Sequence, residues 1–174
     1  MRKERIRSFA PIADRHARVL ILGSMPGRAS LDAGRYYAHP QNAFWRIASE
    51  LLRIDPQARY ALRVKSLKSA RIAVWDVLHS CVRHGSLDAR IEKEIANDFA
   101  AFFRAHPGIT HVFFNGAKAE ASYRRHVQSR VGGPLRDRVL HFMRLPSTSP
   151  AHAALPFKRK LAAWRAILKA EASS

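Results

Sequence analysis

The stretch that most constrains the fold covers residues 19–45 and has the pattern of a strand, a turn and the start of a helix. Residues 19–22 are all apolar, which is typical of a parallel strand buried on both faces. Gly23 ends this strand, and Pro26 and Gly27 follow in a short turn. Turns of this composition let backbone N–H groups approach a ligand closely. Since open α/β sheets bind ligands at the carboxyl ends of their strands, we expect a site here.

Aromatic and amide side chains gather just after this turn, before a helical pattern begins at Ala43. Stacking rings and hydrogen-bonding amides are the groups that hold a flat heterocycle, so Tyr36, Tyr37 and Asn42 are candidate contacts. Phe44 begins a one-sided apolar pattern that is typical of core packing. Asn42 also stands where a side chain can cap the N-terminus of a helix, and the sequence leaves both interpretations open.

Three further apolar runs, at residues 72–77, 111–115 and 139–145, alternate with amphipathic segments. This order predicts an α/β fold, a three-layer α/β/α sandwich around a short, mostly parallel four-stranded sheet. We expect a single domain over residues 1–174, with a basic N-terminal arm at about residues 1–17. Between the second and third strands we expect a loop over residues 81–86. An amphipathic helix is expected to begin at Ser86 and to end before Pro107.

The charge of the chain indicates a polyanionic partner. Thirty-one Lys and Arg against 13 Asp and Glu give a formal net charge of +18. Lys and Arg supply most of the non-specific affinity for nucleic acid, which we favour over an anionic membrane surface or a generally basic proteome. Cys81 is the single cysteine, so the chain cannot form an internal disulfide, and we expect a reducing cytoplasm. No apolar run is long enough to span a bilayer, and the histidines lack metal-ligand spacing.

Polar residues end the second and third predicted strands, where they can face the same cleft as the first turn. Asp76 can accept from or orient a base edge, or cap the following turn, and the adjoining Trp75 can wall the pocket. Asn115 either contacts the base or forms an ordinary Asn-Gly turn. After the fourth strand, small hydroxyl residues between prolines form a rigid turn that can hold phosphates. The candidate DNA contacts are Pro146, Ser147, Thr148, Ser149, His152 and Lys118.

These segments resemble the uracil-DNA glycosylase superfamily, and most closely its hypoxanthine-DNA (deoxyinosine) glycosylase group. The Gly-x-x-Pro loop that follows the first strand in that superfamily is matched by residues 23–27. The segment YYAHPQNAFW is similar to the second half of this motif in the hypoxanthine group. The segment LPSTSP, residues 145–150, is similar to the last motif, which enters the DNA. The resemblance covers nearly the whole chain and implies the same three-layer fold.

Two departures from the superfamily pattern shift the expected chemistry. The third residue of the first motif, which handles water in several relatives, is Met25, and the His that opens the last motif is replaced by Leu145. The resemblance implies that Asn42 takes the catalytic part. An amide is a poor general base, so Asn42 would orient water, or bind the base, with the backbone amides around Ser24 stabilising the departing base. The candidate base contacts are Gly23, Met25, Pro26, Gly27, Tyr36, Tyr37, Trp75, Asp76 and Asn115.

The sequence therefore predicts a DNA repair glycosylase that flips a deaminated base out of DNA and hydrolyses its N-glycosidic bond. Hypoxanthine is the favoured base. No motif places a Lys nucleophile, so we expect a monofunctional enzyme without metal or cofactor, acting as a monomer on DNA. The alternatives are a uracil-preferring glycosylase and a non-catalytic nucleic-acid-binding module of the same fold.

Overall fold

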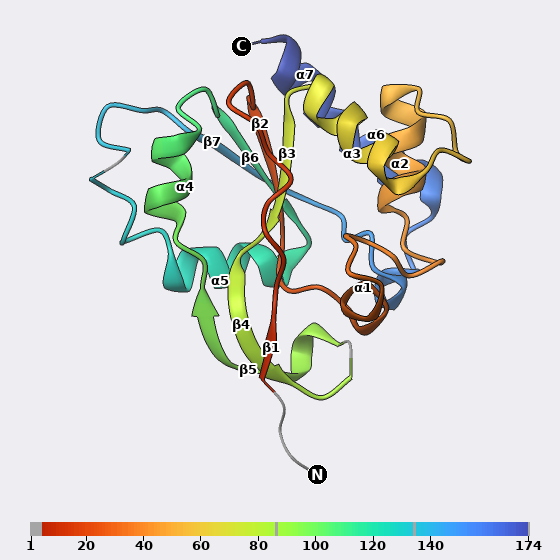
Figure 1. Ribbon diagram of the computed structural model, residues 1–174, viewed down its shortest axis with the longest axis horizontal. Helices are drawn as coiled ribbons and strands as arrows, with labels where there is room; N and C mark the ends of the chain where they lie inside the picture. The colour runs from red at the N-terminus through yellow and green to blue at the C-terminus, as the bar shows by residue number, and fades with distance from the viewer. Residues whose placement is uncertain (1–4, 86, 134, 174) are drawn as a thin grey trace.

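A four-stranded parallel sheet forms the centre of the protein in the computed structural model, which describes residues 5–85, 87–133 and 135–173 (Figure 1). The strand order is β3-β2-β6-β7. The strands are β2 (Val19–Gly23), β3 (Ile72–Asp76), β6 (His111–Asn115) and β7 (His141–Leu145). Gly23 pairs with Asp76, and Asn115 pairs with Leu145, so all four strands end at the same edge of the sheet. The predicted strands and their parallel arrangement are confirmed.

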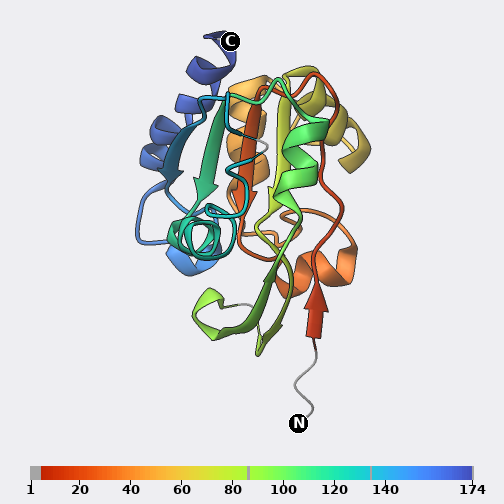
Figure 2. The same ribbon diagram turned by 90° about the vertical axis from the view of Figure 1, so that its left-hand side faces the viewer.

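Helices cover both faces of this sheet (Figures 1 and 2). One face packs on α2 (Phe44–Leu52), α3 (Tyr60–Ser69), α6 (Phe157–Trp164) and α7 (Ala166–Ala172). The other face packs on α4 (Phe99–Ala105) and α5 (Ala117–His126). Along β2, Ile21 points into the first of these cores while Leu20 and Leu22 point into the second, as the two-residue period of a strand requires. The predicted three-layer sandwich is confirmed.

A second, antiparallel sheet extends beyond the carboxyl ends of the central strands (Figure 1). It contains β1 (Arg5–Arg7), β4 (Leu78–Arg83) and β5 (Ile91–Ala96), in the order β1-β4-β5. The β4–β5 hairpin includes the short helix η1 (Asp88–Arg90). Next to the central sheet, α1 (Arg28–Ala33) follows the turn after β2.

The loop predicted over residues 81–86 and the helix predicted from Ser86 onward are wrong. The chain continues in β4 to Arg83 and returns as β5, and the next α-helix begins only at Phe99. Ser86 lies outside the described residues. Ile91 and Ile95 are four residues apart, a spacing that fits one face of a helix and also one face of a strand. Residues 91–96 form a strand and not a helix because they pair antiparallel with β4.

The described part of the N-terminal segment is fixed to the body. Ile6 pairs with Cys81 in β4, and Ile12 forms an isolated bridge with Val74. The indole N–H of Trp75 donates a 3.1 Å hydrogen bond to the carbonyl of Phe9. Residues 1–4 of the predicted arm lie outside the described residues.

Strand β7 forms an edge of the central sheet and is largely open to solvent. Its only strand partner among the described residues is β6. Phe142 and Met143 are 46% and 50% exposed, although the Phe142 ring still packs against Tyr123. In the parts of the chain that the structure describes, no helix combines the length and apolar content needed to span a membrane.

Candidate functional site

Gly23 is the point where groups from three segments converge. A Cβ atom added at this position would lie 2.6 Å from Oδ1 of Asp76 and 3.3 Å from the hydroxyl oxygen of Tyr37. Any side chain here would therefore displace one or both of these polar groups. Glycine is required because the carboxyl group and the phenol approach the backbone so closely.

Asp76 is buried, with 4% of its surface exposed, and its Oδ2 atom has no hydrogen-bond partner among the described residues. Burial and, to a smaller extent, the neighbouring Asp88 raise the pKa of this carboxyl to about 7, and Arg83 opposes the shift. A carboxyl group with such a pKa exchanges a proton near neutral pH, so it can donate or accept a hydrogen bond. Buried polar groups without partners are rare, which makes Asp76 a candidate ligand contact.

Asn115 connects the end of β6 to two other segments. Its Nδ2 donates to the Tyr37 hydroxyl at 3.2 Å and to Oγ1 of Thr148 at 2.9 Å. Its Oδ1 accepts the backbone N–H of Thr148 at 2.9 Å. The side chain thus holds Tyr37 and the segment after β7 in place.

The two adjacent tyrosines have different surroundings. Tyr36 is 5% exposed, and its hydroxyl donates a 2.8 Å hydrogen bond to the carbonyl of Ala10. Tyr37 has a positive φ of 53° and stacks on Phe44 with ring centroids 4.0 Å apart. That backbone turn directs Tyr37 toward Gly23, so Tyr37 reaches the site while Tyr36 packs in the core.

Asn42 stands at the start of α2 with a half-buried side chain. Its Oδ1 accepts the backbone N–H of Phe44 at 2.9 Å, so the oxygen stabilises the first turn of the helix. The next residue, Ala43, donates its N–H to the carbonyl of Thr148 at 2.9 Å, which links this helix to the segment after β7. An amide oxygen has a second lone pair, and the Nδ2 group has no partner among the described residues, so Asn42 can still bind a ligand.

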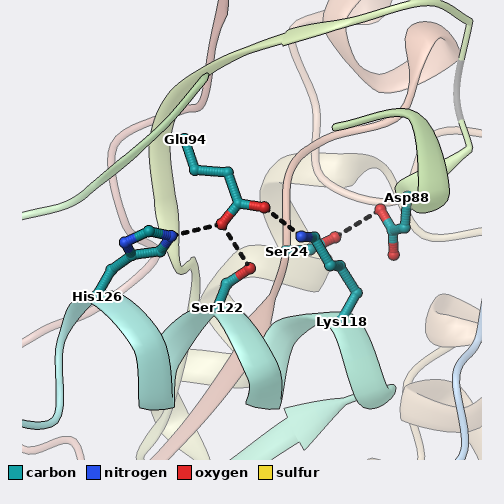
Figure 3. A network of polar contacts seen from close by, with 6 residues as sticks. All are labelled: Ser24, Asp88, Glu94, Lys118, Ser122 and His126. Atoms are coloured by element: carbon teal, nitrogen blue, oxygen red, sulfur yellow. Dashed lines mark hydrogen bonds and ion pairs between the residues drawn. The ribbon is translucent and has the colours of Figure 1, made fainter. Parts of the chain in front are cut away.

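The turn after β2 is held by the β4–β5 hairpin, which was not among the predicted site segments. The Ser24 hydroxyl donates to Oδ1 of Asp88 at 2.7 Å (Figure 3). Arg83 donates from Nη2 to the carbonyl of Pro26 and from Nε to the carbonyl of Gly85. The sequence did not indicate that Asp88 and Arg83 hold this turn, because 64 and 57 residues separate the partners of these contacts. The only sequence signal was Gly85, which stands in the turn between β4 and β5.

Lys118, a predicted DNA contact, instead forms an ion pair with Glu94 inside a polar cluster (Figure 3). The other oxygen of Glu94 accepts from Ser122 at 3.2 Å and lies 2.7 Å from Nε2 of His126. Burial alone would raise the pKa of Glu94, but the hydrogen bonds from Lys118, His126 and Ser122 lower it overall. The cluster fastens β5 to α5.

The segment after β7 is a series of short polar turns. Ser147 Oγ accepts the N–H of Ser149, and Ser149 Oγ accepts the N–H of Ala151 at the start of η2 (Pro150–His152). Thr148 is 1% exposed, whereas His152 is exposed. The carbonyl of Pro146 accepts the indole N–H of Trp164, which anchors the segment to α6.

The structure brings together only some of the predicted residues. Gly23, Tyr37, Asp76, Asn115 and Thr148 meet at the strand ends. Three other predicted base contacts, Met25, Tyr36 and Trp75, have side chains in the two cores. The turn over residues 24–27 therefore contributes its backbone and the Ser24 hydroxyl. Within the described residues, no group of three His, Cys, Asp or Glu side chains is placed to hold a metal ion.

Comparison with known proteins places this arrangement in a family. Residues 10–169 match the family model of the uracil DNA glycosylase superfamily. A protein of Methanosarcina barkeri named hypoxanthine DNA glycosylase is 38% identical over 112 residues, which cover 64% of this chain and 71% of that protein. A protein of the same name from Methanosarcina acetivorans is 37% identical over 114 residues, covering 65% and 72%.

A solved structure extends the similarity to the whole fold. It is a solution NMR structure from Methanosarcina acetivorans, provisionally assigned as a uracil DNA glycosylase, with a TM-score of 0.76 and 30% identity. The match covers 95% of this chain and 99% of that one. The sequence motifs, the layered fold and these matches agree, and the chain belongs to the uracil DNA glycosylase superfamily.

Proposed function

We propose that this chain is a DNA glycosylase that hydrolyses the N-glycosidic bond of hypoxanthine after the deoxyinosine nucleotide has been flipped out of DNA. The observation that carries the proposal is the buried Asp76 carboxyl, which lies beside Gly23 and Tyr37 and whose Oδ2 has no hydrogen-bond partner in the described parts of the chain. Two relatives named hypoxanthine DNA glycosylase support the same substrate.

The base is recognised by groups that surround Gly23. Hypoxanthine presents N–H and carbonyl groups on one edge and a ring nitrogen acceptor on another. A carboxyl group that exchanges its proton near neutral pH can bind either kind of edge, and Asp76 has a pKa of about 7. The Tyr37 ring, which packs on Phe44 through one face, stacks on the base through the other.

The reaction is a displacement at the sugar carbon C1′. The oxygen of a water molecule bonds to C1′ while the bond from C1′ to N9 of the base breaks and its electron pair passes to the base. The proton released by the water finally neutralises the base. Asn42 positions the water through its amide, and the backbone N–H groups of Ser24, Met25 and Gly27 stabilise the charge on the departing base. The Lys118 amine is paired with Glu94, so we propose hydrolysis without a covalent intermediate.

DNA is held by its backbone around this site. Ser147, Ser149 and His152 lie on the polar turns after β7, where hydroxyl and backbone groups meet phosphates. The formal charge of +18 supplies long-range attraction to the duplex. The enzyme acts as a monomer in the cytoplasm. Uracil is the second candidate base, because one solved relative is provisionally assigned as a uracil DNA glycosylase.

The test is a single-turnover strand-cleavage assay on matched duplexes that contain deoxyinosine, deoxyuridine or only normal bases, with alkali added after the reaction. Wild-type protein is expected to release hypoxanthine. Asn42→Ala removes both the amide and the acceptor of the Phe44 N–H, whereas Asn42→Ser keeps an oxygen that can accept this N–H. Gln41→Ala, at the exposed neighbouring position, is the matched control.

The two Asn42 variants separate catalysis from folding. Both are expected to lose base release, while Asn42→Ser keeps the melting temperature of the wild type. Full activity in Asn42→Ser would mean that Asn42 only stabilises the start of α2 and takes no part in catalysis. Release of uracil alone would move the substrate to the second candidate. No release from any duplex, with salt-sensitive binding intact, would leave a DNA-binding module.

A further inference from the structure

The β3–β4 connection and the β4–β5 hairpin hold the turn over residues 23–27 by its carbonyl groups. The carbonyl of Gly23 accepts the N–H of Val77 at 2.8 Å, and the carbonyl of Ser24 accepts the N–H of Leu78 at 3.1 Å. The carbonyl of Pro26 accepts from Arg83. Three of the carbonyls in this short turn are therefore directed at a single neighbouring segment.

This arrangement fixes the direction of the backbone N–H groups. In a trans peptide the C=O of one residue and the N–H of the next point in opposite directions. The N–H groups of Ser24, Met25 and Gly27 therefore point away from the hairpin. None of the three donates to an acceptor among the described residues. They form a small set of backbone donors directed away from residues 77–83.

Arg83 adds a buried positive charge to the same turn. Its side chain is 8% exposed, and besides its bonds to the Pro26 and Gly85 carbonyls its Nη1 has no partner within the described residues. Asp88, from the same hairpin, fixes the Ser24 hydroxyl. At the end of β7, the buried Leu145 offers no side-chain donor, so donors near the departing base must come from elsewhere.

We propose that Arg83 and Asp88 are positioning residues that hold the N–H groups of this turn toward the departing base, and that the buried guanidinium adds positive charge beside it. The proposal rests on the proposed function and assigns a catalytic task to the β4–β5 hairpin. The electron pair of the broken glycosidic bond passes to the base, and N–H donors with a fixed direction stabilise that charge without reorganisation.

The kinetic test compares Arg83→Met and Arg83→Lys with Arg138→Met. Arg138 is the control because, like Arg83, it donates to backbone carbonyls. Its three acceptors, those of Phe103, His106 and Ile109, lie near α4. In Arg83→Met, kcat for deoxyinosine release is expected to fall about 100-fold with little change in KM. Arg83→Lys, which keeps the charge, should recover part of that loss. Arg138→Met should stay within about threefold of the wild type.

An independent readout follows the turn itself. Backbone amide NMR signals of Ser24, Met25 and Gly27 are expected to shift in Arg83→Met and in Asp88→Ala, and to stay in place in Arg138→Met. Unchanged signals in Arg83→Met would overturn the proposal, as would equal kcat losses in Arg83→Met and Arg138→Met while both remain folded. If the wild-type protein released no base, the proposed function would be rejected. The NMR comparison would still show whether the β4–β5 hairpin fixes the backbone conformation of residues 23–27.

Discussion

Two carboxylates, the half-buried Glu94 and the buried Asp76, have opposite surroundings. Glu94 is contacted by Lys118, Ser122 and His126, and these donors lower its pKa. Asp76 has one oxygen with no partner among the described residues, and burial raises its pKa to about 7. A satisfied carboxylate strengthens a framework, whereas an unsatisfied one costs stability and is kept where a ligand can use it.

The largest expected effect comes from closing the space around Asp76. Gly23→Ala places a methyl group 2.6 Å from Oδ1 of Asp76, so the carboxyl group and the Tyr37 hydroxyl must both move away from residue 23. Because small displacements of catalytic groups cost large factors in rate, we expect kcat for base release to fall about 100-fold. Gly133→Ala, where an added Cβ meets nothing within 4 Å, is the control. A fully active Gly23→Ala enzyme would mean that the site does not depend on this contact.

Next in size is the removal of the satisfied carboxylate. Glu94→Ala leaves the ammonium, hydroxyl and imidazole groups of its partners without their shared acceptor. We expect the free energy of unfolding to fall by about 2 kcal/mol, measured by urea denaturation. Glu120→Ala, which breaks pairs with the more exposed Arg124 and Arg144, should cost less than about 1 kcal/mol. Equal decreases in the free energy of unfolding of the two variants would mean that Glu94 contributes no more to stability than Glu120.

The third effect is the pH dependence that Asp76 imparts to stability. Its pKa rises from 3.8 to about 7 on folding, so between these values the folded state binds more protons than the unfolded state. Stability must then decrease as pH rises through this range and level off above it. From pH 6 to pH 8 the contribution of Asp76 to the free energy of unfolding should fall by about 1 kcal/mol.

Asp76→Asn should remove this decrease, and urea denaturation at the two pH values measures the difference between wild type and variant. Asp98→Asn, which keeps a residue that caps helices well at the start of α4, is the control and should leave the decrease in place. Parallel pH profiles for wild type and Asp76→Asn would show that Asp76 ionises normally.

The smallest effect concerns Lys118, whose charge is engaged by Glu94. Lys118→Gln is expected to lower stability by less than about 1 kcal/mol and to change DNA affinity by less than about threefold. Fluorescence anisotropy with a labelled duplex, repeated over a range of salt concentrations, measures the latter. A clear decrease in the salt dependence would mean that Lys118 leaves Glu94 to meet a phosphate.

The sequence was sufficient for the central sheet because its strands are short, apolar and separated by helices. Residues 111–115 form β6 with the predicted bounds, and the ends of β2 and β3 differ by one residue from those predicted. The resemblance to the superfamily is confirmed. The β4–β5 hairpin was missed because its apolar residues recur at a spacing shared by helices and strands. Only pairing between distant segments separates the two.

The site was only partly predictable for a related reason. Glycine, aspartate and asparagine at strand ends identified Gly23, Asp76 and Asn115 as neighbours, since parallel strands end at one edge. The sequence could not show which of the two tyrosines reaches the site, because the positive φ at Tyr37 is what directs that ring toward Gly23. Arg83 and Asp88 reach the turn after β2 only because β4 and β5 form a hairpin. Since this segment was predicted as a loop and a helix, their contacts with the turn were not predicted. Their roles, like those of Asn42, stay predictions.

The open edge of β7 has a consequence for handling the protein. An exposed strand edge with apolar side chains such as Phe142 and Met143 is a template for pairing between copies. The formal charge of +18 makes copies of the protein repel one another, but only within the electrostatic screening length. That distance shrinks from about 10 Å at 0.1 M salt to about 3 Å at 1 M. Concentrated stocks should therefore stay clear at modest ionic strength and become turbid when salt is raised.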